Sequence, residues 1–113
     1  MTADEALNGL VETLQRLQRI LPADKVTWDS NELVRLASER LWITAGNAAE
    51  EYRRAAGVDA GMEPWAELSG YRNRLAHALP GDLSTDRIWA DTTADLPRLL
   101  IQVQGVLPWQ GFT

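Results

Sequence analysis

The chain has 113 residues, of which 45% are hydrophobic and 24% charged, an ordinary mix for one globular domain over 1–113. Its net charge of −5 argues against general binding of duplex DNA, which needs a basic surface. Cysteine is absent, which excludes a disulfide framework, a thiolate nucleophile and a cysteine metal site. The N-terminus lacks a signal-peptide pattern, and no stretch approaches the ~20 apolar residues that cross a bilayer, so we expect a cytoplasmic protein without membrane contact.

The first expected helix covers residues 4–21, where large apolar residues recur at spacings of three and four. That spacing gives one apolar stripe along a helix and leaves polar residues on the other faces. Pro22 ends the helix. The stripe contains Leu7, Leu10, Val11, Leu14, Leu17 and Leu21.

The second expected helix covers residues 29–56. Asp29 and Glu32 have the spacing of an N-terminal capping box, and Gly57 is a natural C-terminal stop. The stretch 45–49 is rich in alanine and glycine, which would let another helix approach closely.

A third, shorter helix is expected after a loop over 58–63. Pro64 suits its first turn, because the missing backbone donor is not needed there. The helix should continue through His77 and end before Pro80.

The last expected helix begins at 84–85 and is stopped by Pro108. Pro97 lies inside it and predicts a kink or break around 94–96, since proline removes a donor and disfavours helix before it. Strand patterns are nearly absent, so the sequence predicts an all-α, antiparallel bundle of four to five helices with the last one broken near Pro97. The remaining residues form a tail that could be pinned by Trp109 and Phe112.

The residues best suited to chemistry lie in the run from Arg72 to His77. His77 is the only histidine, and an imidazole can both give and take a proton near neutral pH. Asn73 lies four residues earlier, about 40° away around a helix, so the two side chains share a face. Arg72 lies about 140° from His77, so it must reach around the helix or act together with a second subunit.

This trio suits metal-independent cleavage of a phosphodiester. A histidine can deprotonate a ribose 2′-hydroxyl or protonate the leaving oxygen, and an arginine can stabilise charge on the phosphate oxygens. Asn73 could orient the imidazole. One histidine cannot be acid and base in the same step, so a two-fold dimer would supply the second. The spacing alone also fits a structural role, with His77 making one hydrogen bond at a helix end and the arginines solvated.

Two further residues could bind the substrate. Arg74 and Arg72 together could form a small basic site in this acidic protein. Tyr71 could stack on a base, because single-stranded RNA is often held by aromatic side chains. Of the five tryptophans, we expect Trp42, Trp65 and Trp89 to serve packing.

Carboxylates recur along the last helix, but no histidine joins them. A solvated acidic face therefore fits them better than a metal site, and we expect no metal and no cofactor. These residues are Asp82, Asp86, Asp91 and Asp95.

The run Tyr71-Arg72-Asn73-Arg74-Leu75-Ala76-His77 resembles the R-x-x-x-x-H motif of HEPN domains. With Pro64-Trp65 before it, and Trp89 and Leu96-Pro97 after it, the chain resembles the HepT-like branch in particular. That branch is the HEPN partner of minimal nucleotidyltransferases. The resemblance extends over roughly 5–107.

The resemblance implies a HEPN bundle of four or five helices that forms a homodimer. It also implies a metal-independent endoribonuclease toxin of a toxin–antitoxin system, neutralised by a cognate nucleotidyltransferase antitoxin. Arg72 and His77 would be catalytic with Asn73 supporting them, and RNA would be cut where the two motifs of the dimer face each other.

One position departs from the family pattern. Many members carry a tyrosine two residues after the histidine, which the antitoxin can adenylylate, whereas this chain has Leu79 there. Leucine has no hydroxyl to modify, so steric binding could restrain the protein instead. Two alternatives to the ribonuclease stay open. One is a non-catalytic, substrate-binding partner of a nucleotidyltransferase. The other is a structural dimer in which the run from Arg72 to His77 only stabilises the interface.

Overall fold

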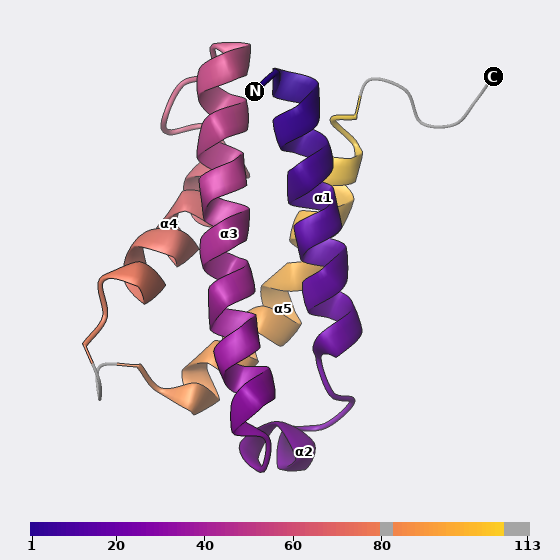
Figure 1. Ribbon diagram of the computed structural model, residues 1–113, viewed down its shortest axis with the longest axis vertical. Coiled ribbons are helices and arrows are strands. Elements are labelled where there is room, and N and C mark those ends of the chain that lie inside the picture. The colour runs from indigo at the N-terminus through magenta and orange to yellow at the C-terminus, as the bar shows by residue number, and fades with distance from the viewer. Residues whose placement is uncertain (80–82, 108–113) are drawn as a thin grey trace, which may run out of the picture.

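The computed structural model describes residues 1–79 and 83–107, and within these ranges the chain is helical and contains no strand. Figure 1 shows α1 and α3 side by side and antiparallel, with α4 against α3 and α5 crossing behind the pair. The predicted all-α bundle is confirmed. No helix in the described part is both long and apolar enough to span a membrane. The helices are α1 (Ala3–Ile20), α2 (Lys25–Asp29), α3 (Glu32–Ala56), α4 (Trp65–Ala76) and α5 (Thr85–Gln104).

Helix α1 forms as its sequence predicts. Thr2 and Glu5 make a reciprocal capping box, in which each side chain accepts a hydrogen bond of 3.1 Å from the backbone N–H of the other. The predicted stripe packs into the core, and only Leu21 at its end is half-buried. The buried members are Leu7, Leu10, Val11, Leu14 and Leu17.

The predicted start of the second helix at Asp29 is wrong. The chain first makes the short helix α2, which is capped by Asp24 through a 2.8 Å hydrogen bond from the Thr27 N–H. Asp29 ends that helix, and its carboxylate pairs with Lys25 at 2.9 Å, so it is not free to cap α3. The Asn31 side chain caps α3 instead.

Helix α3 ends where the sequence predicts. Gly57 adopts the left-handed conformation with φ of 70°, which glycine reaches without steric cost. The helix therefore stops at Ala56, one residue before its glycine cap.

The predicted break near Pro97 is also wrong, because α5 is helical from Thr85 to Gln104 with Pro97 inside it. Proline inside a helix costs about 3 kcal/mol. Leucines on both sides of Pro97 are buried in the core, and full burial of each such side chain stabilises by about 1.5–3 kcal/mol. Burial of Leu96, Leu99 and Leu100 therefore outweighs the cost and keeps the helix continuous. The proposed anchors of the tail, Trp109 and Phe112, lie outside the described residues.

The close approach predicted at the alanine-rich stretch brings α4 onto α3. A side chain on Gly46 would place its Cβ only 2.3 Å from Arg72 Cβ and 2.8 Å from the Leu68 carbonyl oxygen. Ala45 and Ala49 beside it are fully buried. The backbone of α4 therefore rests directly on α3 at Arg72, which fixes where the run from Arg72 to His77 begins.

Candidate functional site

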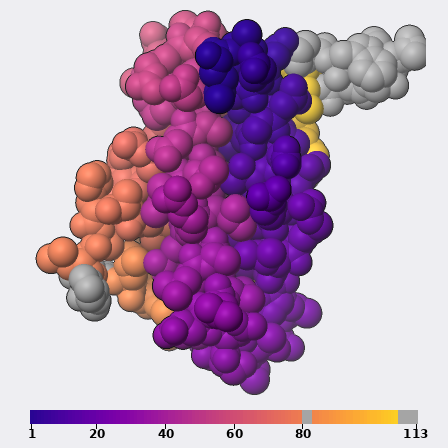
Figure 2. All heavy atoms as spheres, viewed as in Figure 1, coloured from indigo at the N-terminus to yellow at the C-terminus, as the bar shows by residue number. Residues whose placement is uncertain are grey.

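The end of α4 lies at the edge of the molecule. Figure 2 shows α4 protruding from the side of the layer made by α1 and α3. The helix ends at Ala76, and His77 follows as its C-cap with an exposed side chain. Its imidazole makes no hydrogen bond with any other residue in the described ranges. Among the described residues, His77 therefore lacks the single hydrogen bond that the structural alternative places at the helix end.

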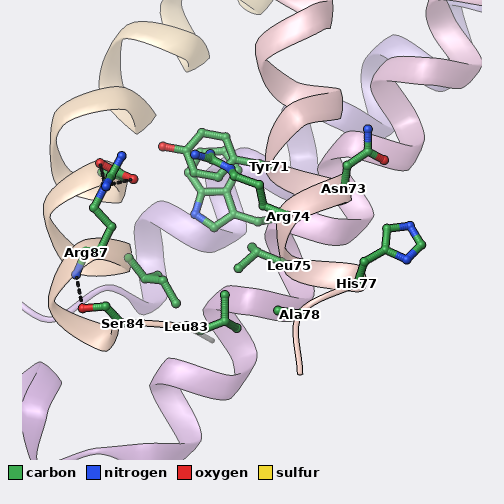
Figure 3. A pocket seen from close by; sticks show the side chains of 12 residues that line it. Tyr71, Asn73, Arg74, Leu75, His77, Ala78, Leu83, Ser84 and Arg87 are labelled. Carbon is green, nitrogen blue, oxygen red and sulfur yellow. Dashed lines mark hydrogen bonds and ion pairs between the residues drawn. The ribbon is translucent and has the colours of Figure 1, made fainter. Parts of the chain in front are cut away.

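Asn73 and His77 extend to the same side of α4 (Figure 3), as their spacing of four residues predicts. Both side chains are exposed. An amide and an imidazole are thus presented together at the edge of the molecule, where a substrate or a second subunit can reach both.

Arg72 turns toward α3 instead. It lines a small pocket of about 220 Å³ together with Asn47, Glu50, Glu51 and Arg54, and His77 is not part of that pocket. The Arg72 Nη1 donates a hydrogen bond of 3.2 Å to Asn73 Oδ1. Arg72 and His77 therefore line different pockets, while Asn73 accepts a hydrogen bond from Arg72 and shares a side of α4 with His77.

The carboxylates near Arg72 have other partners. Glu50 pairs with Arg53 at 3.1 Å and accepts a hydrogen bond of 2.8 Å from Ser69, and these contacts lower the pKa of Glu50, that of Arg53 most. Glu51 pairs with Arg54 at 3.2 Å. Arg72 has no ion pair within the described part of the chain, so its charge remains available for an anion such as phosphate.

A larger pocket of about 740 Å³ opens between the end of α4 and the beginning of α5. It combines polar residues of the motif, an apolar wall and the first turns of α5. Its lining includes Asn73, Arg74, His77, Leu83, Ile88 and Arg87.

Two stacked aromatic rings, those of Trp42 and Tyr71, line this pocket. Tyr71 lies parallel to Trp42, with ring centroids 3.9 Å apart and planes 6° apart. The Trp42 indole N–H donates to Thr92 Oγ1 at 2.9 Å, and the Tyr71 hydroxyl donates to Asp95 Oδ2 at 2.5 Å. These contacts tie α3 and α4 to α5 and hold the end of α4 in one orientation.

The Tyr71 side chain contacts neighbouring residues through both its ring and its hydroxyl. Burial and the hydrogen bond to the Asp95 carboxylate raise the pKa of Tyr71, so the phenol stays protonated. Trp42 covers one face of its ring, and the Arg74 guanidinium carbon lies 4.7 Å from the ring centroid. A base could stack on Tyr71 only by displacing one of these side chains.

The carboxylates of α5 are paired rather than simply solvated. Asp86 pairs with Lys25 at 2.8 Å, and Asp91 pairs with Arg87 at 3.0 Å. Asp95 pairs with Arg98 and accepts the Tyr71 hydroxyl. Asp82 lies outside the described residues. Within those residues, no group of three histidine or acidic side chains is placed to hold a metal ion.

Two of the three tryptophans expected to serve packing are buried in the core, namely Trp42 and Trp65, and the third, Trp89, is half-buried with its ring 5.4 Å from that of Trp28. The sequence did not single out Thr92 or Arg87. Thr92 had a usable signal, because it is a polar residue four positions from both Ile88 and Leu96 on the apolar face of its helix.

A family model described as "Ribonuclease HepT-like" matches residues 10–106, a span that includes the whole run from Arg72 to His77. No curated protein and no solved structure matches the chain.

Proposed function

The chain belongs to the HepT-like ribonuclease family, and from that premise we propose that it is a metal-independent endoribonuclease whose catalytic residues are Arg72, Asn73 and His77. The observation that carries the proposal is the exposed imidazole of His77 beside Asn73, whose amide oxygen accepts a hydrogen bond from Arg72. Arg74 lines the adjoining pocket above Tyr71 and would contact the substrate.

In the proposed reaction the His77 imidazole takes the proton from a ribose 2′-hydroxyl. The 2′-oxygen then forms a bond to the neighbouring phosphorus as the bond to the 5′-oxygen breaks. The 5′-oxygen receives a proton from a second acid, and the products carry a 2′,3′-cyclic phosphate and a 5′-hydroxyl. Arg72 would stabilise the charge on the non-bridging oxygens, and Asn73 would hold the imidazole in place.

A homodimer would supply the second acid. One imidazole cannot accept and donate a proton in the same step, so the His77 of a second copy would protonate the leaving group. The position of α4 at the edge of the molecule favours this arrangement, because two such edges can meet (Figure 2). A dimer would also let Arg72 of one copy serve a phosphate held by the other.

We further propose that the ribonuclease is the toxin of a toxin–antitoxin pair with a nucleotidyltransferase antitoxin. Leu79 offers no hydroxyl for adenylylation. Neutralisation would then rest on steric binding of the antitoxin over the exposed end of α4.

A second candidate function is a non-catalytic, substrate-binding subunit of a nucleotidyltransferase. It is favoured by Leu79 in place of the family's tyrosine and by the net charge of −5. Expression of the chain alone separates the two, because a toxin arrests growth whereas a passive subunit is harmless.

The direct test is cleavage of a labelled, unstructured RNA in EDTA by the wild type, His77→Ala and Arg72→Ala. Arg16→Ala is a matched control, because it removes one exposed arginine from α1, far from the motif in the sequence. We expect cyclic-phosphate products from the wild type and Arg16→Ala only. Equal cleavage by all four proteins would reveal a contaminant, and cleavage by none would favour the partner subunit; both results contradict the proposed ribonuclease.

A further inference from the structure

The pocket between α4 and α5 extends well beyond Asn73 and His77, the two proposed catalytic residues that line it. Its volume of about 740 Å³ falls in the range of small-molecule sites, roughly 300–1,000 Å³. One wall is apolar and contains Leu75, Leu83 and Ile88. The polar groups gather on the α4 and α5 sides, which is the composition expected of a site that fixes a ligand by a few directed contacts.

Arg74 supplies the first of these contacts. Its guanidinium lies 4.7 Å from the centre of the Tyr71 ring and has no carboxylate partner in the described part of the chain. An arginine stacked on an aromatic ring keeps its N–H donors directed outward from the edge of the guanidinium plane. Arg74 is therefore held in place while its donors remain open to an anion.

Arg87 supplies the second contact from the neighbouring helix. The Arg87 Nε–H donates hydrogen bonds to both carboxylate oxygens of Asp91, at 3.2 and 3.0 Å, which orients the Arg87 side chain. Its two terminal amino groups make no hydrogen bond with any residue that the structure describes, and 72% of its side chain is exposed. Figure 3 shows Arg74 extending from α4 toward α5, where Arg87 lies, whereas Asn73 and His77 extend away from α5.

The charge of this region favours an anion. Among the described residues that line the pocket, two are arginines and one is a carboxylate, Asp91, which is already paired with Arg87. Tyr71 adds no charge, because its phenol stays protonated. His77 and Asn73 also line this pocket, although their side chains extend away from α5 (Figure 3).

We propose that this pocket is the subsite for the nucleotide next to the cleaved bond. Arg74 and Arg87 bind the non-reacting phosphate of that nucleotide, and its sugar or base lies against Leu75 and Ile88. This inference rests on the proposed ribonuclease function and adds Arg87 to it as a substrate-binding residue that does not touch the reacting phosphate.

The first test measures binding without cleavage. The probe is a fluorescent single-stranded RNA with every 2′-hydroxyl methylated, which cannot form a cyclic phosphate, and anisotropy is recorded over a series of salt concentrations. Arg87→Ala should weaken binding about tenfold. It should also reduce the slope of log K against log salt by about 0.7, the value for one lost phosphate contact on a single strand.

Two variants serve as controls for this binding test. Arg16→Ala removes an arginine from an equivalent i,i+4 pair on α1 and should bind like the wild type within about twofold. Arg87→Lys keeps the charge and should recover the salt slope. Wild-type binding by Arg87→Ala, or an equal loss in Arg16→Ala, would overturn the subsite.

The second test uses cleavable RNA and separates this inference from the function on which it rests. Arg87→Ala should raise KM about tenfold and leave kcat within about twofold of the wild type. A large loss of kcat would place Arg87 at the reacting phosphate and overturn the assignment. If the wild type cleaves RNA and Arg87→Ala is indistinguishable from it, the subsite alone is wrong. If the wild type neither binds nor cleaves RNA, the ribonuclease proposal fails and the subsite fails with it.

Discussion

The two halves of α4 differ sharply, although they belong to one continuous helix. In the first half, Trp65 and Leu68 are buried, and the Trp65 ring packs against Tyr52. In the second half, Asn73 and Arg74 are exposed, and His77 follows as the exposed C-cap of the helix. The first half anchors the helix in the bundle, and in the second half only Tyr71 and Leu75 pack into or against the core, so the remaining side chains can present polar groups.

This difference shows how a small domain can present exposed polar side chains from a helix that is anchored in its core. The aromatic stack of Trp42 and Tyr71 lies where the buried half meets the exposed half, and its hydrogen bonds reach α5. A side chain one turn beyond this stack is exposed but starts from a rigid backbone. Substitutions in the first half should therefore change stability, and substitutions in the second half should change activity.

The largest expected effect is on activity, in the exposed half. His77→Ala should reduce single-turnover cleavage by about 10²–10⁴-fold, the usual contribution of one general acid or base. Because the imidazole is exposed and makes no hydrogen bond with another described residue, the free energy of unfolding should change by less than about 0.5 kcal/mol. Cleavage assays and thermal denaturation measure the two quantities. A variant that is inactive because it has unfolded would contradict the division between the halves.

The next effect is on stability, at the contact that positions α4. Gly46→Ala should destabilise the fold by about 3 kcal/mol, because the new Cβ meets backbone and Cβ atoms of α4, which cannot rotate away. Gly70→Ala is the matched control. A Cβ at this position would contact no neighbouring segment within 4 Å, and the substitution removes a glycine from the middle of a helix. That variant should stabilise by about 0.5–1 kcal/mol. Urea denaturation compares them, and equal effects of the two would contradict the close packing at Gly46.

Tyr71→Phe should lower the free energy of unfolding by about 2 kcal/mol, the typical value of a hydrogen bond to a charged group. The effect depends on pH, because the pKa of Tyr71 is raised above its ordinary value of 10.0 in the folded state. Above pH 10 the unfolded chain releases the phenolic proton while the folded chain retains it, so the contribution of Tyr71 to stability declines. The difference between wild type and Tyr71→Phe should therefore narrow above pH 10. A difference that stays constant would contradict the hydrogen bond to Asp95.

Much of this architecture could be predicted from local pattern. The stripe of α1, the glycine stop of α3 and the shared side of Asn73 and His77 depend on periodicity or on a single cap. Such features are encoded by residues a few positions apart. They can therefore be predicted from the sequence without knowledge of tertiary contacts.

The features that the sequence did not predict have two kinds of cause. The cap of α3 was misassigned between two local candidates, because Asp29 pairs with Lys25 four residues earlier and Asn31 accepts from the Val34 N–H instead, whereas the other features depend on contacts between distant segments. Pro97 does not break α5 because the leucines around it are buried against other helices. Arg87 approaches the motif only through the packing of α5. These last two outcomes have no signature within one helix.

The smallest expected effect lies in the anchoring half, at the hydrogen bond from Ser69 on α4 to Glu50 on α3. Ser69→Ala should lower the free energy of unfolding by about 1 kcal/mol at neutral pH. Arg53 lowers the pKa of Glu50 most and Ser69 adds to it, so the stabilisation exists above the ordinary value of 4.5 and is lost as pH falls through the lower folded pKa. The stability difference between wild type and Ser69→Ala should therefore shrink in acid, which denaturation at pH 7 and pH 3 would measure. RNA cleavage should not change, because the hydrogen bond only fixes the buried half of α4; a loss of cleavage with little loss of stability would mean that the two halves are not separate in function.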